Sequence, residues 1–158
     1  MSGVSLQKLR QLSAAQMATL PLVTLMLGLA RFLTLYVPFR WWRGWITIAT
    51  SDPLNGAPAP PGSEIPPEIH GVGRIVRMAA RHVPFDAVCL PQAMAAQWWL
   101  ARKGWDSQIV IGVDKTRKPD QEPGKLHDLH AWLVCDGHIV TGRAEYSRFR
   151  PFTRPSSG

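Results

Sequence analysis

The chain has 158 residues, a net charge of +7 and two cysteines, Cys89 and Cys135. This length favours one domain that buries a core without a structural metal, and so few cysteines argue against a disulfide framework and favour a reducing compartment. The basic residues are dispersed, and the sequence has no RNP-like, zinc-finger or helix-turn-helix pattern. These features argue against nucleic-acid binding.

The N-terminal region, residues 1–49, is predicted to be hydrophobic and helical. Twenty uncharged residues lie between Arg10 and Arg31, which is long enough to span a bilayer. Polar side chains and Pro21 dilute this segment, so we expect a buried or peripheral helix pair that Pro21 kinks or starts, rather than a membrane span or a signal peptide. The pattern breaks near "YVPFRWW", and "RWWRGW" (40–45) favours a collar facing a membrane or a partner.

The rest of the chain predicts a proline-rich linker and an α+β core. Residues 50–67 carry no apolar period and predict an extended linker, followed by a catalytic core over 68–158. Helices are predicted over 68–82 and 90–103, the second ended by Gly104. Strands are predicted over 107–113, 129–135 and 138–142, and the last two flank Asp136-Gly137, a strong hairpin signal.

Cys89 stands two residues before Pro91, at the entrance of the second predicted core helix. Proline is favoured in the first turn of a helix, which places Cys89 at or near the N-cap. Unpaired backbone N–H groups and the helix dipole stabilise an anion there, so a thiolate has a lowered pKa and is a usable nucleophile. The same N–H groups can hold an oxyanion during acyl transfer. A small buried residue at a helix start is the alternative interpretation.

A nucleophilic cysteine needs a base, and His130 is the best candidate. It opens the apolar strand "HAWLVC" after a polar loop, where it can reach a neighbouring helix N-terminus. A surface or core histidine is the alternative. The order of a cysteine helix, a strand and then a histidine strand resembles papain-like and transglutaminase-like cores.

The segments "CLPQAMAAQWWLARKGWDSQIVIGV" and "LHAWLVCDGHIVTG" resemble the leader-peptidase half of the lasso-peptide biosynthesis B protein family. The shared features are a Cys-Leu-x-x-Ala helix, an "RKG" turn, an "IGV" strand, and a His-Ala-Trp strand with an Asp-Gly turn. The resemblance covers roughly residues 70–145, and the N-terminal helices followed by "PFRWW" also resemble the family.

This resemblance implies a transglutaminase-like (papain-like) cysteine protease core with N-terminal hydrophobic helices. It implies cleavage of a leader peptide from a ribosomally made precursor, whose core a separate ATP-using cyclase then closes into a macrolactam. No leader-binding domain is evident in the sequence, so a separate leader-binding protein is implied. We expect no cofactor or metal, and a cytoplasmic location with peripheral membrane contact through the N-terminal helices.

The third catalytic residue is the ambiguous part of the site. The family is expected to supply an acid that orients His130. A family-style alignment suggests Asp136, but six residues of extended strand span roughly 20 Å, which no side chain bridges. Continuing a regular hairpin places His130 opposite Arg143, so the acid should come from residues 141–145, where Glu145 is the only carboxylate. Asp128 is a local alternative.

Three other interpretations compete with the leader peptidase. A transglutaminase-like acyltransferase would use the same nucleophile and fold. A zinc site could use His127, His130, Cys135 and His138, although strand alternation would point some of these side chains apart. A non-catalytic membrane scaffold would need neither Cys89 nor His130. For the protease, we expect the leader-binding partner to dock on an exposed face formed by Phe39, Trp41, Trp42 and Trp45.

Overall fold

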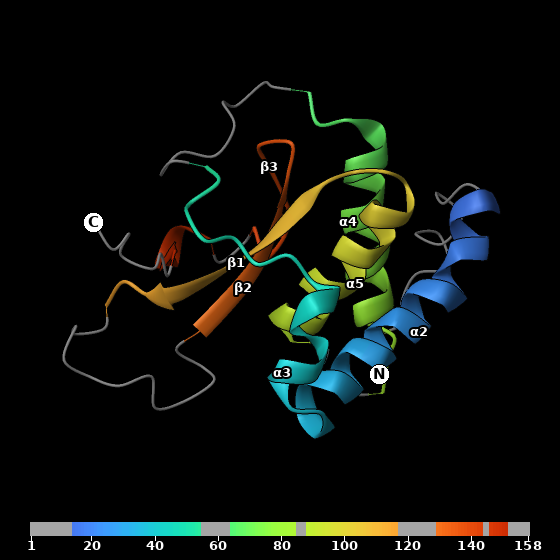
Figure 1. The fold of residues 1–158 in the computed structure, drawn as a ribbon. Coiled ribbons are helices and arrows are strands. Elements are labelled where there is room, and N and C mark those ends of the chain that lie inside the picture. Colours follow the sequence, from blue (N-terminus) through green and yellow to red (C-terminus); the bar gives the residue numbers. More distant parts are fainter. Residues whose placement is uncertain (1–13, 55–63, 85–87, 117–128, 144–145, 152–158) are drawn as a thin grey trace, which may run out of the picture.

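The computed structural model describes residues 14–54, 64–84, 88–116, 129–143 and 146–151 (Figure 1). Within these ranges, four α-helices pack beside a four-stranded antiparallel sheet, which is the predicted α+β class. The helices are α2 (Ala14–Tyr36), α3 (Phe39–Trp42), α4 (Pro67–Ala80) and α5 (Cys89–Arg102). The strands are β1 (Ser107–Asp114), β2 (Leu129–Cys135), β3 (His138–Thr141) and β4 (Phe149–Pro151), with 3₁₀ turns η1 (Arg43–Trp45) and η3 (Tyr146–Arg148).

Among the described residues, α2 is one continuous helix that contains Pro21. Of the two roles expected for this proline, a kink or a helix start, the helix start is wrong. The break predicted near "YVPFRWW" is confirmed, because α2 ends at Tyr36 and α3 begins at Phe39. Val23, Leu27 and Ala30 recur at three- and four-residue steps and are fully buried against α4 and α5. This stripe fixes α2 to the helical layer.

The helix that carries Cys89 has clear boundaries at both ends. α5 begins at Cys89 itself, one residue after the N-cap Val88, so the cysteine is the first helical residue. Gly104 adopts φ +83° and its N–H donates to the carbonyl of Ala101 at 3.0 Å, which confirms the predicted glycine ending. The buried Gln97 amide donates to the carbonyls of Thr47 and Ser107. It thereby ties α5 to β1 and to the extended segment that follows η1.

The sheet has the strand order β3-β2-β1-β4, and all pairs are antiparallel. Asp136 and Gly137 have φ values of +49° and +72°, the positive values that a two-residue hairpin turn requires. Cys135 pairs with His138 as the hairpin predicts, but a bulge between Leu133 and Val134 then shifts the register. The regular register that we extrapolated toward His130 therefore already fails at Leu133, which pairs with Thr141 and not with Val140.

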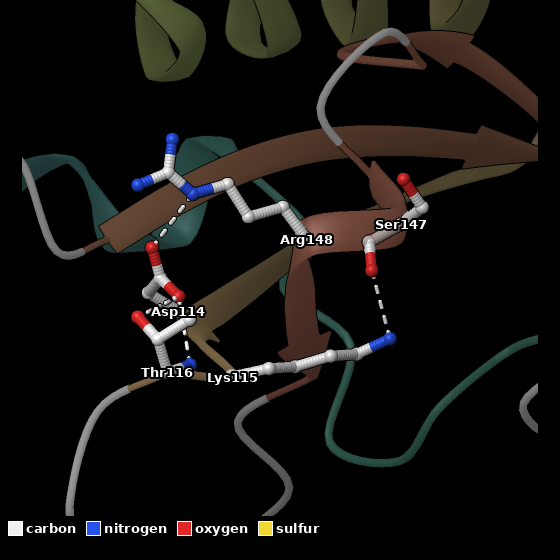
Figure 2. Close-up of polar contacts among 5 residues, drawn as sticks. All are labelled: Asp114, Lys115, Thr116, Ser147 and Arg148. Carbon is white, nitrogen blue, oxygen red and sulfur yellow. Dashed lines mark hydrogen bonds and ion pairs between the residues drawn. The ribbon is translucent and has the colours of Figure 1, made fainter.

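β4 is a short edge strand that the sequence did not predict, and a polar cluster holds it beside the end of β1 (Figure 2). Arg148 Nε donates to Asp114 Oδ2 at 2.8 Å, while Thr116 donates its N–H and hydroxyl to Asp114 Oδ1. Lys115 Nζ donates to the Ser147 carbonyl at 2.8 Å. These contacts fix η3 and place the next residue, Phe149, over β1 and β2.

Candidate active site

Cys89 occupies a position where a thiol is half-buried and still reachable from solvent. It follows Val88, whose backbone is extended, and it starts the 14-residue helix α5. Pro91 has no N–H, so Cys89 and Leu90 carry the N–H groups at this end of the helix. The helix dipole and these donors favour negative charge at the sulfur and at an oxygen beside it.

His130 lies next to this thiol and changes its acidity. Burial alone raises the pKa of Cys89, whereas a hydrogen bond with the His130 side chain and one from the Ala131 backbone lower it. The charge of His130 and a hydrogen bond from the Leu90 backbone add to this effect, so the pKa of Cys89 is lowered overall. The structure thus brings together the two residues that the sequence singled out, and their contact favours the thiolate.

The second residue of β2, His130, is held from two sides and is only 6% exposed. Its backbone pairs with Gly112 of β1. Its Nε2 lies 3.2 Å from the carbonyl oxygen of Gly142. Because a carbonyl only accepts, this contact requires a hydrogen on Nε2 and leaves Nδ1 as the ring nitrogen that can accept the thiol proton.

Gly142 is a residue of the candidate site for which the sequence predicted no role. Its φ is +78°, a conformation that residues with a Cβ rarely adopt. A Cβ here would lie 2.9 Å from His130 Nε2 and 2.8 Å from Trp132 Cβ. The absence of a side chain at Gly142 therefore lets the backbone lie close to the imidazole. A backbone carbonyl occupies the place where we expect the carboxylate of a catalytic acid.

Two aromatic side chains flank the imidazole. The ring of Phe149 stacks on His130 with a centroid distance of 4.9 Å, and Trp132 stacks with a centroid distance of 6.0 Å. Trp132 is fully buried, and Phe149 is 6% exposed. These rings restrict the rotation of His130 and exclude water from its faces. The position of Phe149 had no sequence signal, because it depends on the cluster around Asp114 that holds β4.

Of the three candidate acids, the structure describes only Asp136. Asp136 sits in the hairpin turn at the opposite end of β2 from His130, so it cannot orient the imidazole. This geometry rules out the alignment-based alternative. Glu145 and Asp128 lie outside the described residues.

The zinc alternative is not supported by the arrangement of its ligands. His130 and Cys135 stand at opposite ends of β2, five residues apart, which is roughly 16 Å along a strand. His127 lies outside the described residues. In the part of the chain that the structure describes, no three His, Cys, Asp or Glu side chains gather as metal ligands.

Cys135 has surroundings opposite to those of Cys89. It is 1% exposed, and its thiol donates to the carbonyl of Asp106 at 3.2 Å. Burial and the nearby charges of Asp136 and Asp106 raise its pKa to about 11. At neutral pH this thiol stays protonated and packs as a small apolar side chain.

A half-buried thiol at a helix N-terminus, beside an imidazole on an antiparallel strand, is the arrangement that cysteine-dependent acyl transfer requires. The family model of the transglutaminase-like superfamily matches residues 33–154, which include both site residues. The chain therefore belongs to the transglutaminase-like superfamily, whose members are typically cysteine-based enzymes. The match confirms the expected fold. No curated protein and no solved structure matches the chain.

Proposed function

We propose that this protein is a cysteine endopeptidase that removes the leader peptide from a ribosomally made lasso-peptide precursor before macrolactam closure. The observation that carries the proposal is the contact between Cys89 and His130, which lowers the pKa of the thiol. The substrate class comes from the sequence resemblance of the Cys-Leu-x-x-Ala helix and the His-Ala-Trp strand to the lasso-peptide B protein family. Membership of the transglutaminase-like superfamily is compatible with this chemistry.

In the proposed reaction, Cys89 Sγ attacks the scissile carbonyl carbon as the thiol proton passes to Nδ1 of His130. The carbonyl π electrons move to oxygen, and the N–H groups at the start of α5 stabilise this oxyanion. The intermediate collapses to a thioester as His130 gives the proton to the leaving amine. A water molecule, deprotonated by His130, then hydrolyses the thioester. This step frees the acid product and restores the thiol.

The group that orients His130 is part of the proposal. The Gly142 carbonyl accepts from Nε2 and thereby stabilises the imidazolium that forms during attack. We retain Glu145 as the candidate catalytic acid, because it follows Gly142 closely in the sequence, with Asp128 as the local alternative. In this scheme a carboxylate adds to an orientation that the backbone already provides.

The proposed partners follow from the division of labour in lasso-peptide maturation. A cysteine and a histidine alone give little selectivity for one peptide bond, so binding energy from remote parts of the substrate must supply it. We propose that a separate leader-binding protein presents the precursor, and that an ATP-dependent cyclase consumes the product. The proposed location is the cytoplasm.

The test is a cleavage assay with the purified protein, a precursor peptide and its leader-binding protein, followed by mass spectrometry. Hydrolysis at one bond, absent in Cys89→Ala, supports the peptidase. A second reaction series contains a primary amine at high concentration, because an acyltransferase uses the same thioester but passes it to an amine. Amide product in preference to acid would favour the acyltransferase. No reaction of any precursor with either acceptor would refute both.

A further inference from the structure

Helix α2 is apolar on two opposite faces, and among the described residues only one of these faces is buried. Val23, Leu27 and Ala30 are buried against α4 and α5. At 100° per residue, a second apolar stripe points about 180° away from the first. Its members are Leu25, Leu29, Phe32, Leu35 and Tyr36, which are 43–72% exposed.

The second stripe continues onto α3 and η1, where Phe39, Trp41 and Trp45 are 51%, 70% and 60% exposed. We call these eight side chains the apolar face. Among the large hydrophobic side chains that are exposed in the described residues, only Val88 lies outside it. Trp42, which we had expected on this surface, is 4% exposed and donates its indole N–H to the Val37 carbonyl, so that expectation is wrong. So many large apolar side chains exposed on consecutive elements of one segment are typical of an interaction site.

The charged residues within the segment that forms the apolar face, residues 25–45, are all positive. Arg40 and Arg43 are exposed between its aromatic residues, and Arg31 is half-buried next to Phe32. The first acidic residue of the whole sequence is Asp52. An apolar stripe with tryptophans and arginines at one end matches a lipid headgroup region that carries negative charge. An acidic groove on a soluble partner protein would match the apolar face less well, because long aliphatic side chains make up much of the area of this face.

The packing of α2 determines how it can meet a bilayer. Residues Ala18–Tyr36 are long and apolar enough to cross a membrane by composition. However, α2 lies on the side of α4 and α5 away from the sheet, with one face covered by them (Figure 1). A helix held in this way can lie along a membrane surface without leaving the domain. Its orientation leaves the sheet and the Cys89–His130 pair on the aqueous side.

We infer that the apolar face binds the surface of a membrane containing anionic phospholipids, with α2 parallel to that surface. The exposed leucines enter the acyl boundary, the tryptophans lie at the headgroups, and Arg40 and Arg43 contact lipid phosphates. This attachment is independent of the peptidase proposal, since a domain with an inactive thiol would bind equally well.

The experiment measures co-sedimentation of the full chain with vesicles of phosphatidylcholine alone or with 30% phosphatidylglycerol, a composition chosen as roughly that of an anionic membrane. We expect binding to the anionic vesicles that weakens as salt increases. Arg40→Gln/Arg43→Gln should lower partitioning roughly 25-fold, because each charge near the surface contributes about five-fold. The matched control is Arg102→Gln/Lys103→Gln, which removes two exposed charges at the end of α5 and should bind like wild type.

A second variant, Trp41→Ser/Trp45→Ser, should lose vesicle binding while it keeps the wild-type melting temperature. Equal loss in the α5 control, or no binding of the wild type to anionic vesicles, would overturn the inference. Dimerisation in solution that the tryptophan variant abolishes would assign the face to a second copy instead. Resistance of the membrane-bound chain to alkaline carbonate extraction would show that α2 spans the bilayer, and would also overturn it.

Discussion

The two cysteines of this protein lie near opposite ends of strand β2, and the pKa values of their thiols are shifted in opposite directions. Cys89 begins α5 beside the start of β2, where an imidazole and backbone N–H groups surround the sulfur and lower its pKa. Cys135 ends β2, where a backbone carbonyl and two carboxylates surround the sulfur and raise its pKa to about 11. These surroundings suit Cys89 to the proposed role of nucleophile, whereas those of Cys135 favour a protonated thiol that packs in the core.

Burial does not explain this difference, since desolvation raises the pKa at both positions. What differs is the polarity of the groups that each secondary-structure end presents. The start of a helix offers N–H groups, whereas Cys135 lies beside the negatively charged Asp106 and Asp136. A comparison of the two thiols therefore tests the proposed site with an internal control.

The largest expected effect is the loss of activity in Cys89→Ala. Removal of the nucleophile should reduce kcat/KM roughly 1,000-fold or more, while Cys135→Ala should keep activity within a few-fold of wild type. Circular dichroism should show both variants folded, because alanine fits both positions. Comparable losses in the two variants would mean that the cysteines act together, and the single-nucleophile mechanism would be wrong.

His130→Ala should cause a loss of similar size and should also change the reactivity of Cys89. The imidazole lowers the pKa of that thiol, so its removal raises the pKa and decreases the thiolate fraction at pH 7. The measurement is the rate of iodoacetamide alkylation against pH, followed by peptide mass spectrometry. In wild type, Cys89 should react first, because at pH 8 only roughly one in 1,000 of the Cys135 thiols, with a pKa of about 11, is ionised.

His138→Ala serves as the matched control for this experiment. His138 is a nearly buried histidine at the other end of the β2–β3 hairpin, paired with Cys135. Its removal should leave the alkylation profile of Cys89 unchanged. A profile that moves equally in both variants would show that general destabilisation, rather than the imidazole, controls the thiol.

Gly142→Ala should reduce kcat by roughly 10- to 100-fold through displacement of the imidazole. The added Cβ would come within 2.9 Å of His130 Nε2, and the residue would be strained at φ +78°. Gly137→Ala is the control, because it has a similar φ of +72° but nothing within 4 Å of the new Cβ. Similar stability losses with a kcat effect only in Gly142→Ala would establish the positioning role.

Glu145→Gln separates the backbone acceptor from the proposed acid. If the Gly142 carbonyl is sufficient to orient His130, this variant keeps most of its activity, as does Asp128→Asn. If Glu145 supplies the third catalytic group, kcat should fall by roughly 100-fold or more, with little change in KM. The kinetic parameters of the two variants, measured over a range of pH, decide between these mechanisms.

The sequence was sufficient to predict the parts of the fold that depend on local patterns. The helix around Val72 and Val76, the glycine ending at Gly104 and the Asp136-Gly137 turn each follow from neighbouring residues, and the structure confirms them. The proximity of Cys89 and His130 could also be predicted from the sequence, because the start of a helix and the start of a strand restrict where their side chains can point.

The parts that could not be predicted depend on tertiary contacts. The bulge beside Leu133 shifts the register, and no turn or periodicity in the sequence announces it. Beyond the bulge, the Gly142 carbonyl lies 3.2 Å from His130 Nε2, in the region where a regular ladder predicted a carboxylate. Similarly, Pro21 predicted a kink or a helix start, but α2 continues through it and packs on α4 and α5.

The smallest expected effect concerns stability at alkaline pH. The pKa of Cys135 is raised in the fold from 9.0 to about 11, so folding favours the protonated thiol. The resulting stabilisation is fully present below pH 9 and is lost as the pH rises from 9 to 11, because the unfolded chain then ionises first.

Urea unfolding of Cys89→Ala and of Cys89→Ala/Cys135→Ala over this range isolates the effect. The difference in free energy of unfolding between the two variants should decrease by at most about 2 kcal/mol from pH 8.5 to pH 11. A constant difference would show that Cys135 ionises as easily in the fold as in the unfolded chain, and that its reactivity relative to Cys89 is not controlled by the charges of Asp106 and Asp136.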